Sequence, residues 1–163
     1  MPRKKITATK LKVGLPFGIG ELQFEPDEVQ EQAAWALYVE LVTRIAVQPL
    51  DPDHGTSHDA LVSLYSLFGT TRKILREAGP RVATGKNSVG VIAIEVLNRG
   101  IRPFLAKWHP LLESYEQTKP TNVNQREHER AWEEDLVLRK NLAKLQEDLR
   151  LYAQALAEIA RIK

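Results

Sequence analysis

The chain has 163 residues, of which 43% are hydrophobic and 27% charged, and these fractions are typical of a single globular domain. It contains no cysteine, which excludes disulfides, thiolate metal sites and cysteine nucleophiles and leads us to expect a cytoplasmic protein. No segment approaches the roughly 20 consecutive apolar residues that a transmembrane helix needs, so we expect no membrane partner.

The net charge of +2 is unevenly distributed along the chain. Residues 1–12 carry five bases and no acid, whereas residues 13–59 carry nine acids and one base. Residues 60–120 then carry nine bases against four acids. Blocks of opposite sign either complement each other within one fold or act between molecules, where they attract a charged partner. The sequence leaves both interpretations open.

Residues 1–25 predict a basic arm that leads into a small β-hairpin. Apolar and polar residues alternate on both sides of a glycine-rich turn, with the apolar positions at Ile6, Ala8, Leu11, Val13, Leu22 and Phe24. A lone hairpin is only marginally stable in water. We therefore expect residues 1–25 to pack on the helical part of the chain or to pair with another molecule.

The basic arm is a candidate contact for nucleic acid. Its positive side chains are Arg3, Lys4, Lys5, Lys10 and Lys12. Five charges give modest, salt-sensitive binding to phosphates, and no recognised nucleic-acid motif accompanies them. Weak nucleic-acid binding is therefore the third functional hypothesis, and nucleic acid is not the partner we expect.

Four helices are predicted between residues 26 and 163, because amphipathic stretches alternate with loops rich in proline and glycine. The expected ranges are 26–47, 57–78, 86–117 and 125–162. The third range contains Gly100, Pro103 and Pro110, and we expect a kink there because proline removes a helical hydrogen bond. The predicted fold is mainly α: an antiparallel four-helix bundle with a kinked third helix and a small N-terminal β-hairpin, in one domain.

The last predicted helix has the most regular pattern in the chain. Its apolar residues recur in steps of four and three, at Leu138, Leu142, Leu145, Leu149, Tyr152, Leu156 and Ile159. A helix over 125–162 would be about 57 Å long and would extend beyond the first two helices. The overhang would leave Trp132, Leu136 and Val137, or the C-terminal end from Leu156 to Ile162, for another copy, so we predict self-association.

Charged and polar residues interrupt the apolar helices. The candidates are Glu40, Arg44, Arg72, Glu95, Asn98, Arg99 and Arg102. One interpretation is a buried network that fixes the register of the helices, because ionised groups in an apolar interior must be paired. The alternative is a cleft in which the surplus arginines bind an anion such as a phosphate, a nucleotide or a carboxylate.

Trp108 and His109 form a second candidate site in the third predicted helix. Histidine can act as a base or a ligand near neutral pH, and an adjacent aromatic ring can stack on a bound ring. The competing interpretation makes Trp108 a core or interface anchor and His109 a cap for a carbonyl that Pro110 leaves free.

No metal, cofactor or catalytic motif meets its spacing requirements. The segment from Gly79 to Ser88 has five residues between its glycines and Asn87 after Lys86, which does not match a phosphate-binding loop. No histidine lies three residues after a glutamate, as a carboxylate di-metal bundle would need. His54 and His58, near Asp51, Asp53 and Asp59, could at most hold an adventitious cation.

Because no catalytic arrangement remains, we predict a non-enzymatic interaction, scaffold or regulatory module that binds a protein partner or a second copy of itself. The alternative is a sensor or small enzyme that binds a nucleotide or a phosphorylated metabolite in an interhelical Arg/Glu cleft. An open pocket around these residues would favour the ligand hypothesis, and sealed ion pairs would disfavour it.

Overall fold

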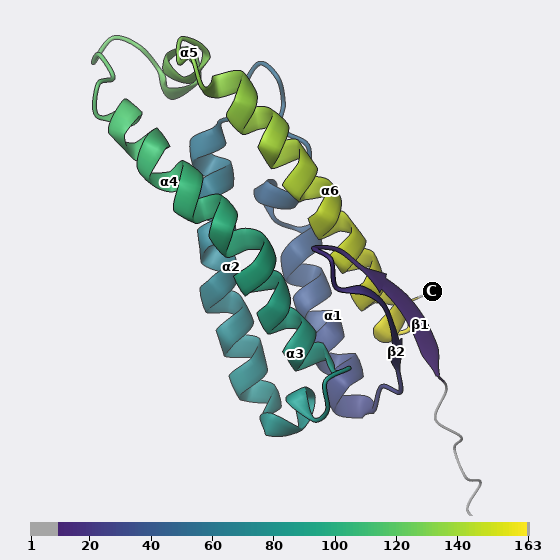
Figure 1. The fold of residues 1–163 in the computed structure, drawn as a ribbon. Helices are drawn as coiled ribbons and strands as arrows, with labels where there is room; N and C mark the ends of the chain where they lie inside the picture. Colours follow the sequence, from purple (N-terminus) through teal and green to yellow (C-terminus); the bar gives the residue numbers. More distant parts are fainter. Residues whose placement is uncertain (1–9, 163) are drawn as a thin grey trace, which may run out of the picture.

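A computed structural model describes residues 10–162 and confirms a mainly helical fold with a small antiparallel hairpin at its N-terminal side (Figure 1). Short 3₁₀ turns at Ile45–Val47 and Pro80–Ala83 and a π-helical segment at Val96–Ile101 connect some of the helices. The strands and helices are β1 (Leu11–Leu15), β2 (Gly20–Phe24), α1 (Glu28–Val42), α2 (Ser57–Ala78), α3 (Val89–Glu95), α4 (Arg102–Glu116), α5 (Gln125–Arg130) and α6 (Asp135–Ile159).

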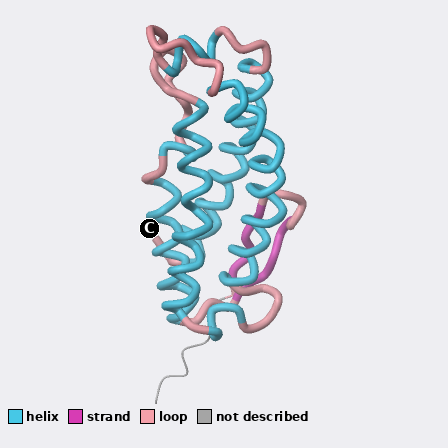
Figure 2. Tube along the Cα trace, turned by 90° about the vertical axis from the view of Figure 1, so that its left-hand side faces the viewer, coloured by secondary structure: helices cyan, strands magenta, loops and turns pink. Residues whose placement is uncertain are grey.

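The long helical segments lie alongside one another and alternate in direction. α1 and the α3–α4 rod run one way, and α2 and α6 run the other way (Figure 1). α5, the loop before α2 and the loop between α4 and α5 gather at one end, and the hairpin packs along α6 near the other (Figures 1 and 2). This arrangement brings α2 and α4 side by side over most of their lengths.

The hairpin pairs Leu11 with Phe24 and Val13 with Leu22. Val13 and Phe24 are each 1% exposed and belong to the same hydrophobic core as the helices. The predicted hairpin is therefore confirmed for residues 11–24, and it packs on the helical part, as expected for a two-stranded sheet. Ile6 and Ala8, which we also assigned to it, lie outside the described residues.

The predicted extent of the first helix is wrong, because α1 ends at Val42 rather than Val47. Thr43 caps α1, Arg44 adopts an extended conformation, and the chain then forms the 3₁₀ turn. The early end places Ala46 and Val47 in the core, at 0% and 1% exposure. Burial of these two side chains outweighs the local preference for a longer helix.

The last helix is also shorter than predicted, because the chain breaks between α5 and α6 at residues 131–134. The break turns Trp132 inward, where its ring stacks on Tyr115 at a centroid distance of 5.1 Å. α6 alone is about 37 Å long, so it exceeds α1 and α2 by much less than predicted. Of the residues we assigned to that overhang, Leu136 and Val137 are 82% and 48% exposed, whereas Leu156 and Ile159 are buried.

The heptad pattern of α6 is confirmed. All seven apolar positions from Leu138 to Ile159 are buried, with exposures between 0% and 5%. The interruption near Gly100 is the π-helical segment between α3 and α4, and the ring of Phe17 from the hairpin turn lies against Gly100 there. Within residues 10–162 no helix combines the length and apolarity that crossing a bilayer requires.

Candidate binding groove between α2 and α4

Two adjoining hollows of about 400 and 560 Å³ lie between α2 and α4 and share Tyr65 and His109. We call them together the α2–α4 groove. Its walls come from α2 (His58, Leu61, Val62, Tyr65, Ser66, Phe68, Gly69 and Arg72) and from α4 (Arg102, Leu105, Ala106, His109, Pro110, Leu112, Glu113 and Glu116).

The floor of the groove is apolar and its rims are open. Leu61, Leu105 and Leu112 are 2–5% exposed, because the same side chains hold α2 and α4 against the core. Val62 and Tyr65, on the rim, are 56% and 55% exposed. A run of exposed apolar surface with a packed floor is typical of a binding surface.

One end of the groove is acidic. Glu113 is exposed, and its carboxylate lies 3.9 Å from Nδ1 of His109. Glu116 accepts hydrogen bonds from Nδ1 of His58 at 2.7 Å and from Nε2 of Gln125 at 3.1 Å. These contacts hold Glu116 in place, while the Glu113 carboxylate stays accessible.

The other end carries Arg72 and Arg102. The Arg102 guanidinium lies over the Phe68 ring, 5.0 Å from its centroid, and its Nε donates to Oδ1 of Asn98 at 3.1 Å. Among the described residues, no carboxylate lies within ion-pairing distance of either arginine. Since Gly69 has no side chain beside Arg72, the two guanidiniums face open space that an anionic group could occupy.

The middle of the groove combines aromatic and backbone groups. The rings of Tyr65 and His109 are 5.3 Å apart and inclined at 57°. Pro110 lies inside α4 and has no N–H, so the carbonyl of Ala106 lacks its usual helical donor. The His109 ring points to the groove, with Glu113 as its neighbour, and Trp108 is buried on the core side of α4 against Trp132.

Glu40 and Arg44 lie elsewhere, between α1 and α2. Arg44 Nη2 donates to Oε2 of Glu40 and to Oγ1 of Thr70, both at 2.7 Å, and Nη1 donates to Oγ of Ser66. The Arg44 side chain is only 20% exposed. This group is a partly exposed polar link between α1 and α2, and Ser66 also touches the edge of the groove.

The seven predicted polar residues therefore do not converge on one cleft. Glu95, the last residue of α3, and Arg99, in the π-helical segment, form an exposed pair at 3.4 Å. Asn98 reaches the groove only through its hydrogen bond to Arg102. Of the predicted candidates, Arg72, Arg102 and His109 line the groove, because helical periodicity identifies a face but not the helix that it meets.

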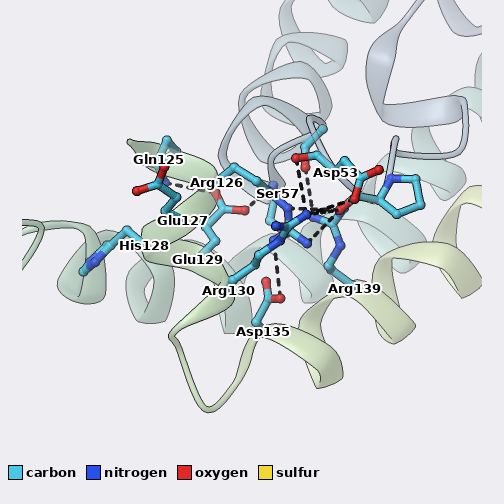
Figure 3. A network of polar contacts seen from close by, with 12 residues as sticks. Asp53, Ser57, Gln125, Arg126, Glu127, His128, Glu129, Arg130, Asp135 and Arg139 are labelled. Atoms are coloured by element: carbon cyan, nitrogen blue, oxygen red, sulfur yellow. Dashed lines mark hydrogen bonds and ion pairs between the residues drawn. The ribbon is translucent and has the colours of Figure 1, made fainter. Parts of the chain in front are cut away.

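Sequence reasoning missed a polar network at the end of the molecule where α5 lies (Figure 3). Glu129 is 0% exposed and accepts from the backbone N–H groups of Ser57 at 2.8 Å and His58 at 3.1 Å. Gln125 also donates to Glu129, at 3.0 Å. Glu129 thus caps the N-terminus of α2 from 72 residues away in sequence, a separation that no local motif reveals.

Three arginines of α5 and α6 bind the loop before α2 (Figure 3). Arg126 and Arg130 donate to the carbonyl of Pro52, and Arg139 donates to the carbonyls of Gly55 and Asp51. Burial and the nearby Arg126 lower the pKa of Arg139. The network fixes the start of α2, and with it His58 at the acidic end of the groove.

The histidines and aspartates near this loop do not gather around a cation position. Asp51 accepts from the N–H groups of Asp53 and His54 at 2.8 and 2.9 Å, and these hydrogen bonds lower the pKa of Asp51. His58 turns away to Glu116. Across residues 10–162 no three histidine, aspartate or glutamate side chains are grouped as metal ligands.

The part of the basic arm that the structure describes is compensated within the hairpin. Lys10 lies 3.6 Å from Glu25, and Lys12 lies 3.9 Å from Glu21. Such exposed pairs are weak, but they place an acid beside each lysine. Arg3, Lys4 and Lys5, the other candidate nucleic-acid contacts, lie outside the described residues.

Comparison with known proteins found no match to a protein family, to a curated protein or to a solved structure. The function must therefore be argued from the α2–α4 groove itself.

Proposed function

We propose that this protein is a non-enzymatic interaction module that holds an amphipathic helical segment of a partner protein in the α2–α4 groove. The observation that carries this proposal is the continuous apolar floor beneath two hollows in line. From His58 to Arg72 the wall of α2 is about 21 Å long, the length of four helical turns.

The shape of the groove favours a protein segment over a small molecule. Small-ligand sites enclose most of the ligand surface, whereas Val62, Tyr65 and His109 are about half exposed along the rims. A helical partner suits these walls because α2 and α4 use most of their backbone groups internally and offer no strand edge for an extended peptide. Tyr65 is the natural anchor, since half-exposed tyrosines dominate many interfaces.

The test is selection of a random peptide library against the folded protein, followed by fluorescence polarisation of each recovered peptide. Tyr65→Ala should weaken binding at least about tenfold, which corresponds to about 1.4 kcal/mol. The matched control is Trp35→Ala on α1, because Trp35 is also an aromatic residue, 52% exposed and stacked on a neighbouring tyrosine. The control should change binding less than about twofold.

Recovery of no peptide, or equal binding to the native chain and Tyr65→Ala, would contradict the proposal. Circular dichroism of both variants shows that a loss of binding is not a loss of fold. The proposed cytoplasmic location rests on the absence of cysteine and needs its own measurement, by fractionation of the source cell.

A second candidate function is binding of a small anion between Arg72 and Arg102. It is favoured by two guanidiniums without a carboxylate partner in the part of the chain that the structure describes. A thermal-shift screen of nucleotides and phosphorylated metabolites tests it, since a ligand that binds only the folded chain raises the melting temperature. The shift must disappear in Arg72→Gln/Arg102→Gln, and a screen without any shift removes this candidate.

A further inference from the structure

The charges along the α2–α4 groove are separated by sign. Arg72 and Arg102 lie at one end, and Glu113 and Glu116 lie at the other. From Arg102 to Glu116 the wall of α4 also extends for about 21 Å. This distance exceeds the Debye length of about 8 Å at physiological salt, so each end acts on the part of a partner nearest to it.

We propose that the groove selects the charge pattern of its partner. The partner is an amphipathic helix with lysine or arginine at the end that lies beside Glu113 and Glu116, and with aspartate or glutamate at the end that lies near Arg72 and Arg102. This inference rests on the proposed function, because it assigns the chemistry of the segment that the groove holds.

The arginine end is prepared for a carboxylate. Arg102 is held by stacking on Phe68 and by its hydrogen bond to Asn98, so its position is set before a partner arrives. A guanidinium pairs with a carboxylate through two parallel hydrogen bonds, and these bonds are among the stronger polar contacts in proteins. Two arginines without a carboxylate partner therefore attract an acidic side chain and repel a basic one.

The acidic end requires the opposite charge. Glu116 already accepts from His58 and Gln125, so Glu113 is the more accessible carboxylate. A lysine or arginine at the nearby end of the partner can therefore pair with Glu113.

A direct test uses two labelled synthetic peptides with the same composition and the same leucine stripe. The first carries glutamates in its first turn and lysines in its last turn, and the second has the same glutamates and lysines divided evenly between its two ends. In fluorescence polarisation at about 0.05 M NaCl, the first peptide should bind at least about tenfold more tightly than the second. At about 0.5 M NaCl the ratio should fall toward one, because salt screens the exposed charges.

Arg72→Glu/Arg102→Glu should abolish the preference, and the milder Arg72→Gln/Arg102→Gln should reduce it. The matched control is Lys73→Glu/Lys107→Glu, which changes the net charge of the same two helices equally at positions outside the groove lining. The control should keep most of the preference. Thermal unfolding of each variant identifies any loss of fold, in which case the Gln pair provides the result.

The outcomes separate this inference from the proposed function. If both peptides bind equally and Tyr65→Ala weakens both, the groove is the binding site and the inference on charge selection is overturned. If neither peptide binds, or if Tyr65→Ala has no effect on either, the proposed function itself fails. A preference that survives unchanged in Arg72→Glu/Arg102→Glu also overturns the inference, because the charge selection then lies elsewhere.

Discussion

Glu129 shows how much one buried side chain can contribute to the start of a helix. Its carboxylate is shielded from water and accepts the N–H groups of Ser57 and His58. A negative charge at a helix N-terminus is favourable, and buried N–H groups are costly when they have no acceptor. Glu129 is 72 residues from Ser57 in the sequence, so the charge pattern of the sequence did not identify its capping role.

We predict that Glu129→Ala lowers the free energy of unfolding by about 2–3 kcal/mol, because it leaves two N–H groups of α2 without their acceptor. Glu129→Gln should cost less, since the amide oxygen still accepts. Urea denaturation measures both, and Glu133→Ala, an exposed neighbour, should change stability by no more than about 0.5 kcal/mol. Equal stability of Glu129→Ala and Glu133→Ala would contradict a capping role.

Tyr152 links stability to alkaline pH. Burial raises its pKa above the ordinary value of 10.0, because the phenolate would lose its hydration in the core. The folded chain then holds the proton more tightly than the unfolded chain. This stabilising contribution is complete below pH 10 and declines as the pH rises from 10 toward the folded-state pKa.

Tyr152→Phe should therefore leave stability nearly unchanged at neutral pH and reduce the loss of stability above pH 10. At pH 11 the difference should reach about 1.4 kcal/mol, as one pH unit beyond the unfolded pKa implies. Tyr115, whose pKa is also raised by burial, is present in both proteins and cancels. Urea denaturation of the native chain and of Tyr152→Phe at pH 9 and pH 11 checks this.

Elements whose residues interact locally were predicted well, and those shaped by distant contacts were not. The buried stripe of α6 follows from helical periodicity alone, since steps of four and three keep one face toward the core. The ends of α1 and α5 depend on where Arg44 and Trp132 find partners on other helices. A single sequence carries little information about such partners, so these boundaries were placed wrongly.

Gly100, in the π-helical segment, packs against Phe17 of the hairpin turn, and this contact can be tested. A Cβ added at Gly100 would lie 2.7 Å from Cδ2 of Phe17 and closer still to other atoms of that ring. Gly100→Ala must therefore displace the hairpin turn or the helix, and we expect a loss of about 1–3 kcal/mol. Thermal or urea unfolding measures it.

Gly69 is the matched control, because a Cβ there would meet nothing within 4 Å. It lies in the interior of α2, so Gly69→Ala should raise stability by about 0.5–1 kcal/mol. A stable Gly100→Ala variant would mean that Phe17 can leave its position on the helix at little cost.

At the scale of the whole molecule, three of the predicted site residues line one groove, namely Arg72, Arg102 and His109. The sequence could identify them as charged or titratable positions in amphipathic helices. It could not pair α2 with α4, and so it could not separate these residues from Glu40 and Arg44, which fasten α1 to α2. The choice of neighbouring helix depends on packing of the complete fold.

Self-association remains a prediction, and its basis has moved from a helical overhang to two exposed side chains. Leu136 and Val137 lie in the first turn of α6, and they are 82% and 48% exposed. We expect light scattering to give a native mass above 18.5 kDa, and Leu136→Glu should shift it toward the monomer because a charge at an apolar contact is costly. Leu151→Glu, at 41% exposure further along α6, is the control. A monomer at every concentration would end this hypothesis.

Pro110 determines which kind of contact is unfavourable at the middle of the α2–α4 groove. The Ala106 carbonyl beside it lacks its helical donor and must be hydrated when the surface is free. An entirely apolar segment, such as an exposed part of a misfolded chain, would displace that water without supplying a hydrogen-bond donor to the carbonyl. This would cost about 1–3 kcal/mol. A partner that donates a hydrogen bond to this carbonyl from a hydroxyl or an amide avoids that cost. The missing N–H of Pro110 thus makes nonspecific apolar contacts in the α2–α4 groove less favourable.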